Sequence, residues 1–245
     1  DLAAGGEGAP LSALADELLF ARAPRPTAIL NLGGMANFTW LGAGGEVLAF
    51  DTGPCGSLLD GLARRVLGRP CDRDGREALR GEADEALIEE CLRHPYFTRL
   101  PPKSTGRDTF GEAFVDEFLA RVGARPSRRV GELFATAVGL VAEAVARAWR
   151  TFLPVKAKIL LVAGGGAYNP ALVAALAHRA QVRVAPTSLF DVEPKAREAL
   201  VFATLGARGA AGEGSTRSGV TGAAPGRLLG KLSAAPPGSS AKVRP

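Results

Sequence analysis

Apolar and polar positions along the chain predict strands first, and then helices alternating with strands. Apolar runs of strand length lie at 27–32, 35–41 and 46–52, and short turns rich in glycine separate them. Tight turns join antiparallel neighbours, so these three runs predict an antiparallel meander.

After this meander the apolar period becomes helical, beginning with a predicted helix over 55–67. A short helix at 11–21 precedes the meander. Further helices are predicted at 82–93, 109–122, 129–150, 170–179 and within 191–210, and further strands at 156–166 and 181–185. This order predicts an α/β fold with a ribonuclease-H-like mixed sheet, in which α/β units follow the meander and helices cover both faces.

The composition is that of a folded globular protein. Of its 245 residues 47% are hydrophobic, which excludes wholesale disorder. The net charge is +5, but only 6% of residues are aromatic and no basic run contains them, so we predict no nucleic-acid partner. Three cysteines favour a reducing cytoplasm over a disulfide framework. No apolar run reaches the length of a membrane span, so we predict no membrane association.

Asp51 is the carboxylate that the strand pattern places best for chemistry. It ends the third predicted strand, and Gly53 and Pro54 turn the chain directly after it. A carboxylate at a strand end can act as a general base or as a partner of a metal-bound water. It can equally cap the turn through its own backbone, and spacing alone leaves these interpretations even.

Two glycine clusters follow predicted strands. The first is Gly33 and Gly34, and the second is Gly164, Gly165 and Gly166, with Asn169 before the next helix. Glycines let backbone N–H groups approach a phosphate or a flat ring closely, and the asparagine can hydrogen-bond a ligand. Each cluster alone is also typical of an ordinary tight turn.

Two further features are candidates for ligand binding. The loop 101–107, PPKSTGR, combines Lys, Ser, Thr and Arg with Gly, which suits phosphate, although a structured surface loop is slightly favoured. Glu198 lies among Ala and Leu in the last helix, so it points either into a crevice or, more commonly, into solvent. Glu193 lies five residues earlier and off the same helical face.

Taken in order, these segments resemble the anhydro-N-acetylmuramic acid kinase family over nearly all of 1–233. The resemblance rests on AAGGEGAPL (3–11), NLGGMANFT (31–39), FDTGP (50–54), PPKSTGR (101–107), AGGGAYN (163–169), EPKAREALVFATLGAR (193–208) and SGVTGA (218–223). Each stretch is weak alone, but together they are specific.

The resemblance implies an ATP-dependent, two-lobed sugar kinase of the actin-like superfamily. Such a kinase opens the 1,6-anhydro ring with water and phosphorylates O6, giving N-acetylmuramic acid 6-phosphate in peptidoglycan recycling. It implies Asp51 as the catalytic base, Glu198 as a sugar contact, and the two glycine clusters with Asn169 as the ATP site. Magnesium accompanies ATP in such chemistry. The implied partners are the sugar and the nucleotide, and a homodimer is allowed.

Two departures from the family pattern bear on activity. The family begins with a glycine-rich G-T-S-x-D-G loop on its first strand, which does not occur here, so we expect the first lobe to be absent from this chain. Gly56 stands where the family usually has Asn. We therefore expect the chain alone to bind ATP poorly and to turn over slowly or not at all.

The expected organisation has four parts. These are an N-terminal segment from the lobe junction (1–26), a ribonuclease-H-like C-terminal lobe (27–211), a C-terminal extension (212–233) and a disordered tail (234–245). The alternatives to a sugar kinase are another phosphatase or kinase of the same superfamily, a non-catalytic binding fragment, or a nuclease of the same core fold. A nuclease would need several convergent carboxylates, and only Asp51 is placed with conviction.

Overall fold

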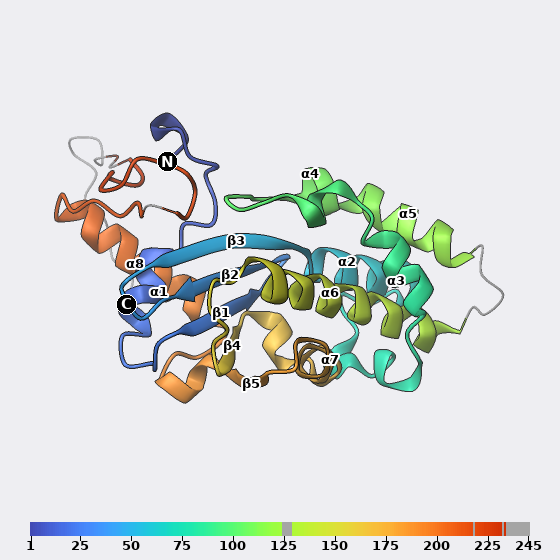
Figure 1. The fold of residues 1–245 in the computed structure, drawn as a ribbon. Helices are drawn as coiled ribbons and strands as arrows, with labels where there is room; N and C mark the ends of the chain where they lie inside the picture. Colours follow the sequence, from blue (N-terminus) through green and yellow to red (C-terminus); the bar gives the residue numbers. More distant parts are fainter. Residues whose placement is uncertain (124–128, 218, 232, 234–245) are drawn as a thin grey trace, which may run out of the picture.

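The computed structural model describes residues 1–123, 129–217, 219–231 and 233. Its centre is a five-stranded sheet in the order β3-β2-β1-β4-β5 (Figure 1). The strands are β1 Thr27–Leu32, β2 Met35–Leu41, β3 Val47–Pro54, β4 Ile159–Ala163 and β5 Arg183–Pro186. The pairs β1–β2 and β2–β3 are antiparallel, whereas β1–β4 and β4–β5 are parallel. The predicted meander and mixed α/β sheet are confirmed.

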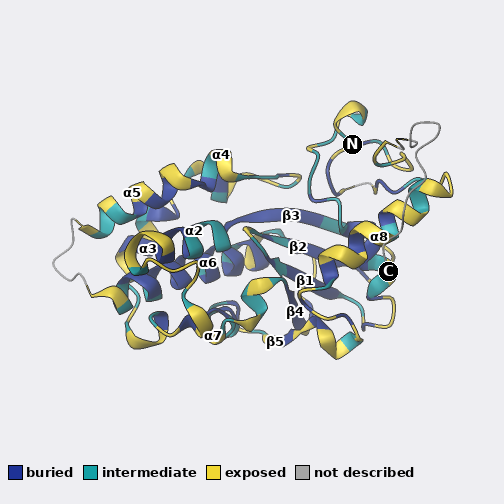
Figure 2. Cartoon of the chain, turned by 180° about the vertical axis from the view of Figure 1, so that it is seen from behind, coloured by how far each residue is buried: buried dark blue, intermediate teal, exposed yellow. Residues whose placement is uncertain are grey.

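Helices cover both faces of this sheet, as predicted. One face carries α2 Gly56–Leu62, α3 Glu85–Cys91, α4 Arg107–Phe110, α5 Glu112–Gly123, α6 Val130–Phe152 and α7 Pro170–Ala180. The other face carries α1 Ala13–Leu19 and α8 Arg197–Ala210, and Figure 2, seen from behind, shows α8 crossing it. The strands are mostly buried between these layers, and the outer sides of the helices are exposed (Figure 2).

Short helical turns complete the architecture. The 3₁₀ turns are Leu2–Ala4, Arg73–Gly75, Ala78–Arg80, Pro95–Thr98, Gly165–Tyr168 and Thr187–Phe190, and a π-helical turn, Ala63–Leu67, continues α2. Among the described residues, no helix has both the length and the apolar character needed to cross a membrane.

The main core follows from the alternation of β1. Ala28, Leu30 and Leu32 pack in the large cluster with α6 and α7, because successive strand residues point to opposite faces. Ile29 belongs to the smaller cluster on the α1 face. Asn31 is the next residue on that second face, and it is polar in a mostly apolar strand.

Two predicted helices differ in the structure. The helix predicted at 109–122 is two helices, α4 and α5, separated at Gly111, where a Cβ would lie 2.1 Å from the carbonyl oxygen of Arg107. The last helix begins at Arg197, after a left-handed residue at Asp191, with φ 62°, and a turn over 194–196. Glu193 consequently lies outside the helix.

The two ends of the described chain pack against each other. The amide of Glu7 donates to the carbonyl of Thr221 at 2.9 Å, and the Thr221 hydroxyl donates to the Asp1 carboxylate at 2.6 Å. These contacts join parts of the segments 1–26 and 212–233. The tail predicted at 234–245 lies outside the described residues.

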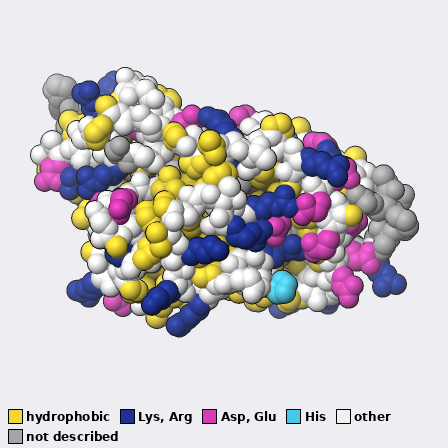
Figure 3. Space-filling view, viewed as in Figure 1, with side chains coloured by type: hydrophobic (Ala, Val, Ile, Leu, Met, Phe, Trp, Pro, Cys, Tyr) yellow, Lys and Arg dark blue, Asp and Glu magenta, His cyan; other side chains and the backbone are white. Residues whose placement is uncertain are grey.

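Charges of both signs are interspersed on the face shown in Figure 3. On the outer sides of the helices, Arg64 pairs with Glu112 at 3.5 Å and Arg121 pairs with Glu90 at 2.6 Å. Exposed pairs of this kind contribute little to stability, but they explain why the excess of arginine forms no single basic area there.

Candidate functional site

A row of three polar side chains crosses the sheet. Asn31 on β1 faces Asn37 on β2, and Asn37 faces Asp51 on β3. Directly opposed residues of antiparallel strands project to the same side, so the three lie on the face that α1 and α8 cover. Neither asparagine was predicted as a site residue, although polar residues inside apolar strands were a usable signal.

Asp51 is buried at the outer edge of the sheet, with 4% of its surface exposed. Its carboxylate oxygen Oδ2 accepts the amide of Thr105 at 2.9 Å. Burial raises the pKa of Asp51 to about 6, and the Thr105 hydrogen bond and the positive charge of Lys103 limit that rise. A carboxyl group with a pKa near neutrality suits a general base, because it is ionised at pH 7 and still accepts a proton readily.

The loop 101–107, which we call the strap, runs along the free edge of β3. The carbonyl of Lys103 accepts the Asp51 amide at 3.2 Å, and the hydroxyl of Tyr96 donates to the Asp51 carbonyl at 2.8 Å. The backbone and carboxylate of Asp51 are therefore fixed from one side. The sequence predicts a phosphate loop or a structured surface loop here, and the structure shows a loop that contacts the predicted base.

The glycine hairpin between β1 and β2 receives the first turn of α2. The amide of Gly56 donates to the carbonyl of Gly33 at 2.9 Å, and the amides of Cys55 and Ser57 donate to that of Gly34 at 3.0 and 2.9 Å. A Cβ at position 56 would lie 2.9 Å from the Gly33 oxygen. Gly56 therefore lets α2 lie close to the glycine hairpin, and a side chain at this position would push the two apart.

Four of the five predicted glycines line one cavity of about 530 Å³, and Gly164 is not among its lining residues. Its walls include Gly33, Gly34, Gly165, Gly166 and Asn169. The structure thus brings together residues that are more than 130 positions apart in the sequence. Sequence reasoning missed Arg73, Tyr168 and Lys195, which also line this cavity and would offer it positive charge and an aromatic ring.

Gly164 and Asn169 also have structural tasks beside that cavity. Gly164 has φ 80°, and a Cβ there would lie 2.7 Å from the carbonyl oxygen of Leu32, so only glycine lets β4 end so close to β1. The Asn169 side chain accepts the amide of Leu172 at 3.2 Å and thereby caps α7. The tight-turn interpretation of this segment and a ligand-binding one are compatible.

Glu198 lines a smaller cavity of about 140 Å³ between α8 and the sheet. Asn31 and Asn37 line it too, so Glu198 faces the same polar row that ends at Asp51. The adjacent Arg197 is buried and binds the Asp16 carboxylate through two nitrogens, with Nε at 2.8 Å. Asp16 also accepts the hydroxyl of Thr39 at 2.6 Å, which fixes the first turn of α8 above the sheet.

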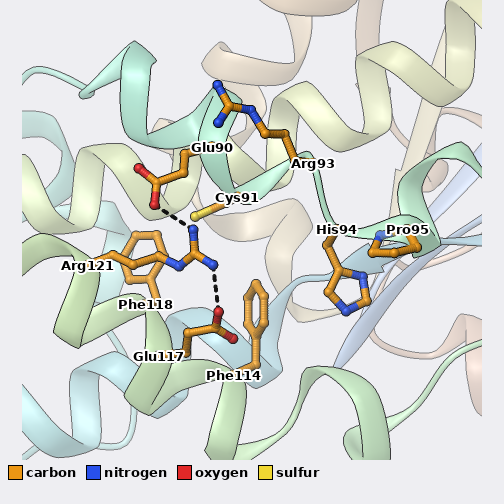
Figure 4. Close-up of a pocket in the computed structure, with 9 residues that line it drawn as sticks. All are labelled: Glu90, Cys91, Arg93, His94, Pro95, Phe114, Glu117, Phe118 and Arg121. Atoms are coloured by element: carbon orange, nitrogen blue, oxygen red, sulfur yellow. Dashed lines mark hydrogen bonds and ion pairs between the residues drawn. The ribbon is translucent and has the colours of Figure 1, made fainter.

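A third cavity, of about 470 Å³, lies between α3 and α5 (Figure 4). Arg121 crosses it and pairs with Glu90 and Glu117, each at 2.6 Å. The charged groups drawn there largely satisfy one another, and no predicted site residue lines it. We therefore place the candidate site at the glycine cavity and the polar row.

One protein-family model, described as anhydro-N-acetylmuramic acid kinase, matches residues 1–235. The chain belongs to this family. A relative of that name from Salinibacter ruber is 42% identical over 241 residues, which cover 95% of this chain and 60% of the relative. One from Gloeobacter violaceus is 42% identical over 227 residues, covering 91% of this chain and 59% of the relative.

This member of the anhydro-N-acetylmuramic acid kinase family thus spans about 60% of the length of the curated relatives it matches. A solved structure similar to it is the activator of 2-hydroxyisocaproyl-CoA dehydratase from Clostridium difficile with bound ADPNP. The similarity has a TM-score of 0.44 at 16% identity, and it covers 82% of this chain and 67% of that one.

Proposed function

We propose that this chain carries the base and part of the nucleotide site of an ATP-dependent kinase. The kinase opens 1,6-anhydro-N-acetylmuramic acid with water and phosphorylates its O6, giving N-acetylmuramic acid 6-phosphate. The observation that carries the proposal is the buried Asp51 carboxylate, which ends a polar row on the same sheet face as Glu198. Family membership supports the choice of reaction.

In this reaction Asp51 takes a proton from the water that attacks the anomeric carbon. The new bond joins the water oxygen to that carbon, the bond from the carbon to O6 breaks, and O6 accepts the γ-phosphoryl group while ADP leaves. The pKa of about 6 keeps Asp51 ionised at neutral pH, as a base must be. Glu198 and the two asparagines of the row offer hydrogen bonds to sugar hydroxyls.

The cavity between the glycine clusters is the proposed place for the nucleotide. Backbone N–H groups at Gly33 and Gly34 can approach phosphate oxygens closely. Lys195 and Arg73 add positive charge at the same cavity, whose lining also includes the carboxyl groups of Asp60, Asp72 and Asp74. Enzymes catalyse phosphoryl transfer mostly by positioning the reactants and by stabilising charge. Electrostatic stabilisation of the phosphates in this cavity would contribute to both.

Magnesium is proposed as the companion of the nucleotide. In such sites it keeps several waters and is bound chiefly through substrate phosphates, where it neutralises charge. Among the described residues, no group of three or more His, Cys, Asp or Glu side chains could hold a metal ion. The proposal therefore places magnesium on phosphate oxygens and requires no protein cage.

A cytoplasmic location and a homodimer remain part of this proposal.

The test is a single-turnover experiment with the chain in excess over the anhydro-sugar, in Mg–ATP. Phosphorus NMR and mass spectrometry would follow ADP and the sugar 6-phosphate. We expect Asp51→Asn to slow product formation by about 10²–10⁴-fold, the usual contribution of a positioned base. Asp191→Asn, an exposed carboxylate whose left-handed conformation Asn tolerates, is the matched control.

The same experiment separates the sugar kinase from its alternatives. Hydrolysis of polyphosphate without phosphorylation of the sugar would favour another enzyme of the superfamily. If the chain forms no sugar phosphate and the anhydro-sugar produces no saturable NMR shift of its amides, the proposed function is wrong.

A further inference from the structure

Lys103, in the strap, is a buried cation without a carboxylate partner. Only 1% of its surface is exposed, and among the described residues no carboxylate lies within ion-pair distance of its ammonium group. Its Nζ donates to the carbonyl of Tyr96 at 3.2 Å. Burying an ammonium group costs free energy. An apolar side chain would fill this space at a lower free energy if the residue served only for packing.

Aromatic rings surround this ammonium group. Nζ lies 4.7 Å from the ring centre of Tyr96, 4.8 Å from that of Phe152 and 6.0 Å from that of Phe50. Cation–π attraction and the carbonyl hydrogen bonds offset part of the cost of desolvation. The side chain of Lys103 is thus anchored in the core, on the face of β3 where Phe50 points.

The backbone of Lys103 and of the residues after it forms hydrogen bonds with Asp51. The carbonyl of Lys103 accepts the Asp51 amide, and two residues later the amide of Thr105 donates to the Asp51 carboxylate at 2.9 Å. Phe50 and Asp51 are consecutive strand residues, so the anchor and the carboxylate lie on opposite faces of β3. Lys103 therefore acts on Asp51 through the strap and through its charge, without facing the substrate.

We propose that Lys103 is a positioning residue for Asp51: its buried ammonium group anchors the strap and thereby keeps the Thr105 amide against the Asp51 carboxylate. The inference concerns the base named in the proposed function. The inference can be tested on the folded chain without any turnover. An experiment can therefore contradict the inference without contradicting the proposed function, and the reverse.

The charges around Lys103 act on its pKa in opposite directions. Burial and, to a smaller extent, the like charge of Arg99 lower the pKa of Lys103 to about 8, although the charge of Asp51 opposes this shift. Arg99 is itself paired with Glu7 at 2.8 Å, and Tyr96, whose pKa is raised by burial, stays a neutral donor. The positive charge of Lys103 keeps the pKa of Asp51 from rising higher.

The experiment is a carbon-detected NMR titration of the Asp51 carboxyl in the whole chain, with Asp51→Asn to assign its signal. Lys103→Met keeps the length of the side chain and removes its charge. We expect it to raise the pKa of Asp51 above about 6 and to speed hydrogen exchange at the Thr105 amide about tenfold or more. Lys158→Met, at an exposed lysine, is the matched control and should change neither.

Wild-type protein provides a second measurement if Lys103→Met does not fold. Between pH 7 and 9.5 the Asp51 carboxyl signal should show a further inflection near pH 8, as Lys103 loses its proton. A folded Lys103→Met variant with an unchanged Asp51 titration and unchanged Thr105 exchange would overturn the inference. A wild-type Asp51 signal that stays flat while the Lys103 Cε signal shows Lys103 losing its proton would do the same.

Discussion

Asp51 is a residue whose ionised form costs folding free energy. Its pKa is raised from 3.8 to about 6, so the folded protein binds this proton more tightly than the unfolded chain does. The destabilisation is therefore present above about pH 6, and it disappears as the pH falls towards 3.8. Perturbed pKa values cluster at functional sites, so this cost supports the proposed role of Asp51 as a base.

We predict that Asp51→Asn stabilises the chain at pH 7.5 and has little effect at pH 4.5. The shift in pKa corresponds to at most about 3 kcal/mol, and the weaker hydrogen bond from Thr105 offsets about 1 kcal/mol of this. Urea denaturation at the two pH values would measure the difference. A variant that is less stable than wild type at pH 7.5 would contradict the burial argument.

At the scale of elements, a buried ion pair connects two helices through residues that are 181 positions apart in the chain. Asp16 on α1 is fully buried and Arg197 at the start of α8 is 3% exposed, and their side chains form a double contact. Glu198 follows Arg197 directly, so this pair sets where the candidate sugar contact lies. Breaking a buried pair from one side leaves an uncompensated charge.

We predict that Asp16→Asn lowers the free energy of unfolding by about 3–5 kcal/mol. The double variant Asp16→Leu with Arg197→Met should recover most of this loss, because it leaves no unpaired charge. The neighbouring Glu17→Gln is the control, since its exposed pair with Arg217 is worth about 1 kcal/mol or less. Equal losses in Asp16→Asn and Glu17→Gln would refute the role of the buried pair.

We predict that substitution by alanine changes stability in opposite directions at two glycines. A Cβ at Gly81 would lie 2.1 Å from the Gly131 carbonyl carbon, at the start of α6, so Gly81→Ala should destabilise by about 1–3 kcal/mol. Gly206, within α8, has open space around it, so Gly206→Ala should stabilise by about 0.5–1 kcal/mol. Thermal unfolding of the two variants checks the close contact. A Gly81→Ala variant as stable as wild type would show that the contact is not rigid.

The elements that the sequence predicted well are those specified by local patterns. The meander, α6 and α7 follow from apolar period and turn residues that lie within each segment. The break at Gly111 is a backbone contact with Arg107, which apolar period does not reveal. The row from Asn31 to Asp51 depends on strand register, and the burial of Lys103 depends on rings from three separate segments, so neither is encoded locally.

At the scale of the whole molecule, the candidate residues are divided between two cavities. Four of the predicted glycines line one of about 530 Å³, and Glu198 and the asparagines line another of about 140 Å³. Phosphoryl transfer needs both substrates held in one geometry. The chain spans about 60% of the length of the relatives it matches, and in the described residues the two cavities share no lining residue.

We therefore predict that this chain binds Mg–ATP weakly, with a dissociation constant of about 1 mM or more. This corresponds to a binding free energy no more favourable than about −4 kcal/mol. Calorimetric titration with and without the anhydro-sugar measures this. Micromolar binding in either titration would contradict the prediction and would mean that the glycine cavity makes most of the nucleotide contacts by itself. Weak binding that the sugar strengthens would instead show that the two cavities are coupled, since each ligand must then favour the same arrangement of the polar row and the glycine hairpin.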